Sequence, residues 1–243
     1  MYKKRLVVLI SILVILIILK LYLNKYITSG ESISLVGVIF LGGAALFQEQ
    51  FKRWWFSPEL EIYFELFPPY CSKTPMYIWW EVPPGPKKEL RTEAYSFRFG
   101  IRNLGKSQAK LCEAFITELK EYKEDKWRDI DYFQQVNLKW PAGRSNDAYL
   151  NINPSPIMMQ CDIGHIIKED RPHVDTTGFR LNYLYQIGGY QPTQLKSNTK
   201  YRFKIMLTSE NAPFTSKCFE LNWTGNWKDK QEDMFKEITI RLV

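Results

Sequence analysis

The sequence predicts two unlike parts: an N-terminal transmembrane α-helical hairpin and a mainly β domain folded as a β-sandwich. Residues 1–53 contain two long apolar runs, whereas residues 54–243 are a polar mixture rich in aromatic residues. Apolar and polar side chains alternate in several segments of the second part, as they do in strands that are packed on one face. No segment after residue 53 shows sustained helical periodicity, so the second part is expected to be built from strands.

The two apolar runs have lengths close to those of membrane-spanning helices. The first, about residues 6–23, is interrupted by Ser11 and Lys20, and about 18 helical residues cover roughly 27 Å of bilayer. The second, about residues 32–48, contains small residues that allow helices to pack closely, among them Gly37, Gly42 and Gly43. Two alternatives stay open: the first run is a cleaved signal peptide, or the second is a buried or interfacial helix.

The charges that flank the runs predict their orientation. Basic residues precede the first run at positions 3–5 and follow the second at Lys52 and Arg53. Because cytoplasmic flanks carry the excess of basic residues, we expect a multi-pass protein of the cell membrane with both termini in the cytoplasm and the lipid bilayer as a partner. Residues 1–53 carry a balance of +5 and the remainder +2, so the basic character belongs to the anchor and no nucleic-acid partner is expected.

Strand-like alternation predicts the elements of the domain spanning residues 54–243. It occurs over residues 59–66, 95–102, 201–208 and 238–242. Between such segments, Asn103-Leu-Gly-Lys106 is typical of a hairpin connection, and the proline-rich residues 67–92 predict a long loop. Lys228–Lys236 is compatible with one or two helical turns. The number of segments favours an immunoglobulin-like β-sandwich of roughly seven to nine strands, with a small β-barrel as the alternative.

Several stretches resemble known proteins. Phe97–Ala109 resembles the strand–turn–strand of immunoglobulin-like adhesion modules. Three pieces resemble an uncharacterised prokaryotic family of two-transmembrane-helix proteins with such a domain: Asn103–Cys112, Asn151–Ile166, and Ser209–Ala212 followed by Phe219–Phe235. This resemblance implies a fold and no activity. The architecture is also similar to that of membrane effectors in bacterial anti-phage signalling.

Side chains able to perform chemistry are few. Cys161 and His165 form the one local pair of soft metal ligands, and they are weak candidates. In a regular strand two residues four apart share a face but lie about 13 Å apart, too far to chelate one ion. Buried thiols beside an ordinary polar histidine are the simpler interpretation. We therefore expect no metal site, no cofactor and no enzymatic activity.

Aromatic residues in the proline-rich segment are candidates for an interaction surface. They are Tyr77, Trp79 and Trp80. Exposed aromatic side chains suit either a protein partner or contact with the membrane interface, whereas the alternative is a small core beneath a long loop.

These observations favour a membrane-anchored, non-enzymatic interaction or binding module on the cytoplasmic face, with a protein partner or self-association. The alternative is a sensor–effector in which the β domain controls membrane-perturbing assembly of the helical hairpin, as in anti-phage defence. Its motivation is the stretch of small residues around Gly42 and Gly43.

Overall fold

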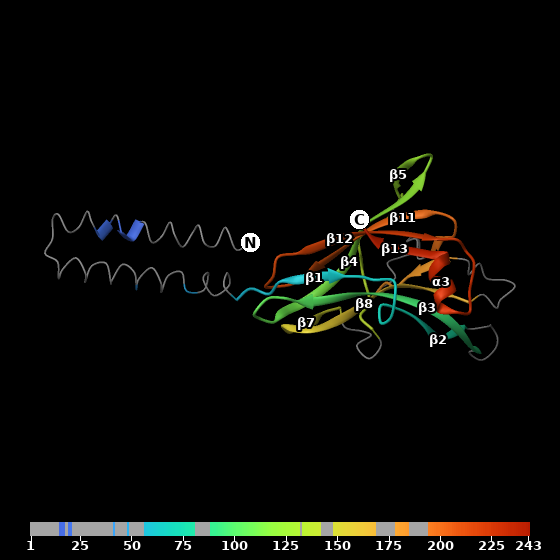
Figure 1. Ribbon diagram of the computed structural model, residues 1–243, viewed down its shortest axis with the longest axis horizontal. Helices are drawn as coiled ribbons and strands as arrows, with labels where there is room; N and C mark the ends of the chain where they lie inside the picture. Colours follow the sequence, from blue (N-terminus) through green and yellow to red (C-terminus); the bar gives the residue numbers. More distant parts are fainter. Residues whose placement is uncertain are drawn as a thin grey trace. The chain divides into compact units, whose positions relative to one another are not determined.

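The computed structural model describes residues 56–80, 88–131, 133–141, 148–168, 178–184 and 194–243, together with residues 15–17, 19, 20, 41 and 48. The chain divides into two compact units, Met1–Trp55 and Phe56–Val243. The second unit contains the strands, which Figure 1 shows with their labels.

One sheet of this unit has six strands in the order β1-β3-β8-β9-β10, with β2 also paired to β3. All its pairings are antiparallel. β3 is long enough to pair with β1 near its C-terminal end and with β2 along its N-terminal part. The strands are β1 (Leu60–Tyr63), β2 (Cys71–Trp80), β3 (Lys88–Asn103), β8 (Ser155–Ile167), β9 (Gly178–Leu181) and β10 (Gln194–Lys196).

The other sheet has seven strands in the order β13-β12-β11-β4-β5, and the short strands β6 and β7 also pair with β4. Figure 1 shows β5 and the end of β4 projecting beyond the rest of the sheet. The strands are β4 (Ala109–Lys123), β5 (Lys126–Asp129), β6 (Val136–Asn137), β7 (Leu150–Ile152), β11 (Lys200–Thr208), β12 (Thr215–Trp223) and β13 (Ile238–Leu242).

Two antiparallel sheets that share one core confirm the predicted β-sandwich-like domain. The alternation predicted over residues 95–102, 201–208 and 238–242 lies in strands, and that predicted over residues 59–66 does so for residues 60–63 only. The alternative of a small barrel is wrong, because the strands form two separate open sheets. The strands also exceed the predicted seven to nine, since short strands such as β6 and β7 carry too few residues to show alternation.

Aromatic side chains from both sheets fill the space between them. Phe203 of β11 and Phe219 of β12 stack with ring centroids 5.4 Å apart and planes at 3°. Phe99 of β3, in the facing sheet, lies 6.5 Å from Phe219 at an angle of 51°. All three side chains are at most 1% exposed. Because burial of apolar area is the main stabilising contribution in folding, this cluster is what joins the two sheets.

The connection after β3 differs from its prediction. Asn103–Lys106 was expected to join two strands as a hairpin, but β3 belongs to the six-stranded sheet and β4 to the seven-stranded sheet. The segment is therefore the corner at which the chain crosses between sheets. Local turn residues fix a change of direction, whereas the partner of each flanking strand is decided by contacts distant in sequence.

The predicted long loop over residues 67–92 is also wrong. β2 pairs with β3 over ten consecutive residue pairs, from Cys71–Phe97 to Trp80–Lys88. Pro75 lies within β2, which is an edge strand at this position, and an edge strand tolerates a missing backbone N–H.

The C-terminal segment is held against the six-stranded sheet. Helix α3 (Gln231–Glu237) agrees with the predicted helical turns and inserts Met234 into the core with no exposed surface. The segment before it is held by a hydrogen bond from Tyr95 Oη to the Lys228 carbonyl (3.1 Å). Lys168 adds an ion pair with Asp229 at 2.8 Å. Figure 1 shows α3 at the end of the sandwich that is remote from the β3–β4 corner.

The membrane prediction is contradicted. In the part of the chain that the structure describes, no helix is long and apolar enough to cross a membrane. This finding overturns the predictions that the chain has a transmembrane hairpin, that it is a multi-pass protein of the cell membrane and that both termini lie in the cytoplasm. Both runs have the minimum length for a span, and hydropathy alone indicates an apolar environment without identifying it as a bilayer. Most of residues 6–23 and 32–48 lie outside the described residues, including Gly37, Gly42 and Gly43.

We predict that Phe219→Ala lowers the free energy of unfolding by about 3–5 kcal/mol, because it removes a ring that contacts both sheets and leaves a cavity. Urea unfolding followed by tryptophan fluorescence measures this. The matched control is Phe67→Ala, where the side chain is 48% exposed and the expected change is about 1 kcal/mol or less. Equal effects of the two substitutions would contradict the assignment of the core.

Candidate interaction surface

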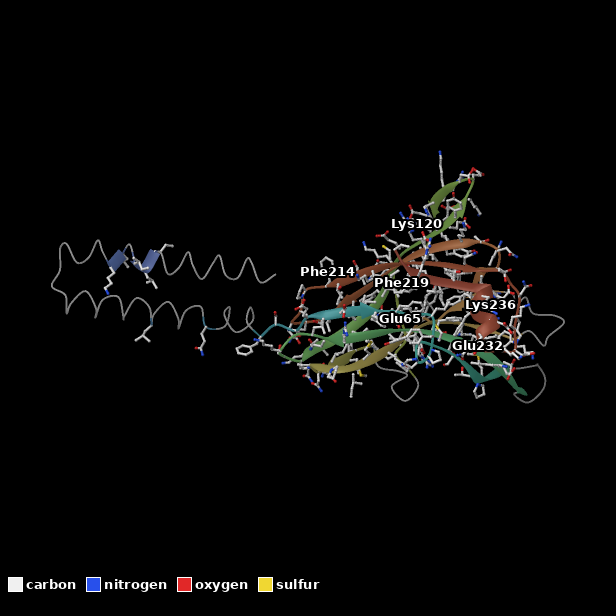
Figure 2. The ribbon with its side chains drawn as sticks, in the orientation of Figure 1. Glu65, Lys120, Phe214, Phe219, Glu232 and Lys236 are labelled. Atoms are coloured by element: carbon white, nitrogen blue, oxygen red, sulfur yellow. The ribbon has the colours of Figure 1, made fainter. Side chains whose placement is uncertain are left out.

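One end of the sandwich combines rigid turns with exposed apolar side chains. We call it the loop end and define it by the segment before β1 (residues 56–59), the β3–β4 corner with the start of β4 (residues 104–111), β7 with the start of β8 (residues 150–157), and the β11–β12 turn (residues 209–214). These turns lie together in Figure 1, and Figure 2 shows Phe214 at this end with Phe219 of β12 inside the sandwich.

The buried amide of Asn103 organises the corner. Its Oδ1 accepts hydrogen bonds from the backbone N–H groups of Glu59 (3.1 Å) and Gly105 (3.0 Å). Its Nδ2 donates to the carbonyls of Ser107 (2.7 Å) and Ile152 (3.0 Å). The side chain is only 2% exposed, so water cannot replace these partners. A single amide thereby connects the chain before β1, the corner and β7.

Gly105 completes the corner because the chain approaches closely there. A Cβ at this position would lie 2.5 Å from the backbone nitrogen of Glu59 and from Cα of Pro58. Only glycine lets the corner approach the segment that precedes β1 so closely.

Three further asparagines fasten the neighbouring turns. Asn211 Oδ1 accepts from the Lys110 N–H (2.9 Å), and its Nδ2 donates to the Gln108 carbonyl (2.8 Å). The Gln108 side chain donates to Asn153 Oδ1 (2.7 Å), and Asn151 Oδ1 accepts from the backbone of β4. Hydrogen bonds from side-chain amides thus connect turns of both sheets where no regular pairing of the described strands does. These bonds hold the conformation of the loop end.

Leu111 has the one strained backbone at the loop end. Lys110 and Leu111 of β4 face a single residue of β7, Asn151, which defines a β-bulge. The φ of Leu111 is +48°, a region that costs a non-glycine residue about 1–2 kcal/mol. A hydrogen bond from its N–H to Asn151 Oδ1 (2.9 Å) holds this conformation. The bulge places the leucine side chain in solvent, where it is 48% exposed.

Large apolar side chains stand on this rigid framework. Leu104 is 54% exposed and Phe214 is 70% exposed. Because Leu104, Leu111 and Phe214 are exposed, they do not gain the stability that burial of an apolar side chain supplies. Such a group on preformed turns is typical of a surface that binds another protein. The exposed apolar residues of the loop end are Phe56, Leu104, Leu111, Ile157 and Phe214.

A row of charges on the outer face of the seven-stranded sheet is a less suitable candidate. Arg241, Glu220 and Arg202 are direct neighbours across three strands, and Glu220 forms ion pairs with both arginines. Hydrogen bonds from Arg202 and then Arg241 hold the pKa of Glu220 below its usual value. The Arg202 guanidinium also lies 4.3 Å from the ring centroid of Trp127. Since Glu220 is paired with both arginines, the row is typical of a solvated sheet face, although Arg202 Nε is buried and has no hydrogen-bond partner among the described residues.

The structure separates Cys161 from His165. β8 has one more residue than β3 between the pairs Gly164–Phe97 and Asp162–Arg98, namely Ile163. This bulge reverses the alternation of faces, so Cys161 lies in the core while His165 lies on the outer face. Cys161 Sγ lies 3.5 Å from the Lys139 carbonyl, and His165 Nδ1 lies 2.8 Å from Asn182 Oδ1. Burial raises the pKa of the Cys161 thiol well above its usual value.

Metal-ligand groups do not converge elsewhere in the described part of the unit. There, no three His, Cys, Asp or Glu side chains are grouped so that they could hold an ion.

The aromatic candidates Tyr77, Trp79 and Trp80 lie in β2, opposite Arg91, Glu89 and Lys88 of β3. Their side chains are outside the described residues, so a role for them in binding stays a prediction.

The residues of the loop end were missed in the sequence. The exposure of Phe214 could have been predicted, because Phe214 directly follows the turn residues Asn211-Ala-Pro213 and turns lie at the surface. The exposure of Leu111 could not have been predicted, since it results from a bulge that depends on the pairing of β4 with β7.

We predict that Asn103→Ala lowers the free energy of unfolding by at least about 3 kcal/mol, because four backbone groups lose their partner. Asn151→Ala removes one hydrogen bond at an exposed position and is expected to cost about 1 kcal/mol. Equilibrium urea unfolding compares the two. Similar losses would show that Asn103 does not organise the corner.

We also predict an acid-dependent loss of stability that His165 causes. Burial lowers the pKa of His165 to about 4, so the unfolded chain takes up a proton at higher pH than the folded protein. Stability is therefore constant above pH 6.5 and falls as the pH drops toward 4, by about 2 kcal/mol between pH 8 and pH 5. Carboxylates with lowered pKa, such as Glu220, contribute only below about pH 4.5. His165→Gln should flatten urea-measured stability between pH 8 and 5, and an unchanged slope would refute the assignment.

Comparisons of this chain with protein-family models, with curated proteins and with solved structures find no match. The predicted resemblance to an uncharacterised prokaryotic family of two-transmembrane-helix proteins is therefore contradicted. The pieces that suggested it, such as Asn103–Cys112, lie in strands and turns, and such local patterns recur in unrelated β domains because sheet geometry imposes them.

Proposed function

We propose that residues 56–243 form an immunoglobulin-like, non-enzymatic interaction module that binds a second copy of this chain through the loop end. The observation that carries the proposal is that Leu111, strained and exposed, and Phe214, also exposed, both stand at the end of the sandwich whose turns asparagine side chains hold. Strain retained in a native backbone points to a role outside folding, because selection for stability alone would remove it.

The sheet order supports the immunoglobulin-like assignment. In that fold, strands A, B and E are neighbours in one sheet, and G, F, C and C′ follow one another in the other. The orders β1-β3-β8 and β12-β11-β4-β5 correspond to these two series in chain order. β9 and β10 depart from the pattern, since they follow β8 in the chain and occupy the edge that strand D takes in the family.

A side chain at the start of β11 also supports this assignment. Immunoglobulin-like domains have a tyrosine near the start of strand F whose hydroxyl is bonded to the backbone a few residues upstream. Tyr201 is the second residue of β11, and its hydroxyl accepts a hydrogen bond from the Lys196 N–H at 3.0 Å.

Charge at the loop end favours a second copy as the partner. Two acidic residues, Glu59 and Glu210, and two basic residues, Lys106 and Lys110, are exposed around the apolar side chains. A two-fold axis brings the same patch of both copies together, so equal numbers of both signs let lysine of one copy face glutamate of the other. The predicted bilayer partner and the sensor–effector alternative depended on the contradicted transmembrane helices and are not part of this proposal.

We predict that the full chain forms dimers in sedimentation-velocity experiments and that Phe214→Asp weakens dimerisation at least tenfold, because a buried phenylalanine contributes about 1.5–3 kcal/mol. The matched control is Phe67→Asp, which changes another exposed phenylalanine (48%) outside the loop end and should leave the dimer intact. A monomeric wild-type chain, or equal dimerisation of the wild type and Phe214→Asp, would contradict the proposal.

Leu111→Gly separates binding from folding. Glycine adopts a positive φ without strain, so we predict that this variant is more stable to urea by about 1 kcal/mol yet dimerises more weakly. A variant that loses stability, or gains stability with unchanged dimerisation, would show that the strain at Leu111 does not serve the interface.

A further inference from the structure

A polar row crosses the outer face of the six-stranded sheet. Ser72 lies opposite Ser96, Ser96 opposite His165, and His165 opposite Arg180. Directly opposed residues have Cβ atoms about 4.5–5.5 Å apart and point to the same face. The neighbours of Ser96 in β3, Tyr95 and Phe97, are fully buried in the core, so the row belongs to the opposite face.

Hydrogen bonds orient the middle of the row. His165 Nδ1 lies 2.8 Å from Asn182 Oδ1, and because an amide oxygen only accepts, Nδ1 keeps its proton and Nε2 is left for another partner. Ser96 Oγ lies 3.1 Å from Thr74 Oγ1, so two hydroxyl groups meet beside the imidazole.

Arg180 differs from the other described arginines. Arg98, Arg102, Arg128, Arg202 and Arg241 each form an ion pair with a carboxylate. Among the described residues no carboxylate pairs with Arg180, although its side chain is half-buried. It lies opposite His165. Arg98 and Asp162, which are paired across β3 and β8, form an ion pair with each other at 2.7 Å. A half-buried guanidinium without a counter-ion favours the binding of an anion.

We propose that Arg180, His165 and Ser96 form a binding site for a tetrahedral oxyanion of the phosphate or sulfate type. The guanidinium supplies a planar pair of N–H donors, Ser96 a hydroxyl, and the imidazole an Nε2–H donor once it is protonated. Bound anion stabilises the charged imidazole, so anion binding and proton uptake at His165 reinforce each other. The site lies on a sheet face, and its existence does not depend on the loop end.

The test is an NMR titration of the His165 ring in the full chain, with sulfate as the probe because sulfate does not change its charge between pH 4 and pH 8. Sodium chloride at equal ionic strength is the reference. We expect that saturating sulfate makes His165 bind its proton more tightly. The midpoint of its titration should then lie at an at least tenfold lower proton concentration than in sodium chloride. Arg180→Gln should abolish the shift, Arg180→Lys should reduce it, and Arg128→Gln, on the β4–β5 hairpin, should retain it.

An equal effect of sulfate and chloride, or a full shift in a folded Arg180→Gln protein, would overturn the proposal. Urea unfolding of each variant verifies that it is folded. Titration with inorganic phosphate and with O-phosphoserine then identifies the source of the anion. At least tenfold tighter binding of O-phosphoserine supports a phosphate carried on a larger ligand, whereas tighter binding of inorganic phosphate supports a free anion.

Discussion

Four hydrogen bonds to one buried side chain, the amide of Asn103, hold the point at which the chain leaves one sheet for the other. The segment before β1, the corner and β7 all meet at this amide. With the corner fixed, β4 enters the second sheet in the register that places its apolar residues inside. The stacked rings of Phe203 and Phe219 then pack against Phe99 across the core. Apolar burial supplies most of the stability, and the amide holds the corner at which the chain passes from one sheet to the other.

The same network makes the loop end suitable for binding. Asn151, Asn153 and Asn211 hold turns from both sheets, so the framework does not have to become ordered when a partner arrives. The bulge at Leu111 is part of this framework, because it is the amide of Asn151 that stabilises the positive φ. Preformed turns with exposed apolar side chains lower the entropic cost of association, which is the physical basis of the proposed self-association.

Sequence reasoning succeeded where one local rule decides the structure. Alternation in residues 95–102 and 201–208 identified parts of β3 and β11, since each strand has one buried face. It failed where distant contacts decide. The corner at Asn103 has the residues of a hairpin turn, but it joins strands of different sheets. The prolines near β2 predicted a loop, although an edge strand tolerates a proline. The bulge at Ile163 places Cys161 and His165 on opposite faces of the sheet. The membrane anchor was inferred from the length and hydropathy of two apolar runs and from their flanking charges, and it is contradicted. The exposure of Leu111 could not be predicted, because it depends on the pairing of β4 with β7.

Hydrogen–deuterium exchange of the full chain at a series of protein concentrations tests the central claim most directly. The central claim is that the loop end is a preformed interface. The account predicts that backbone amides of Lys110, Leu111 and Ala212, whose hydrogen bonds go to side chains, exchange slowly even in dilute solution. Protection should rise with concentration in the loop end and remain constant elsewhere in residues 56–243. Fast exchange of these amides at low concentration, or a concentration effect centred on another part of the sandwich, would contradict it.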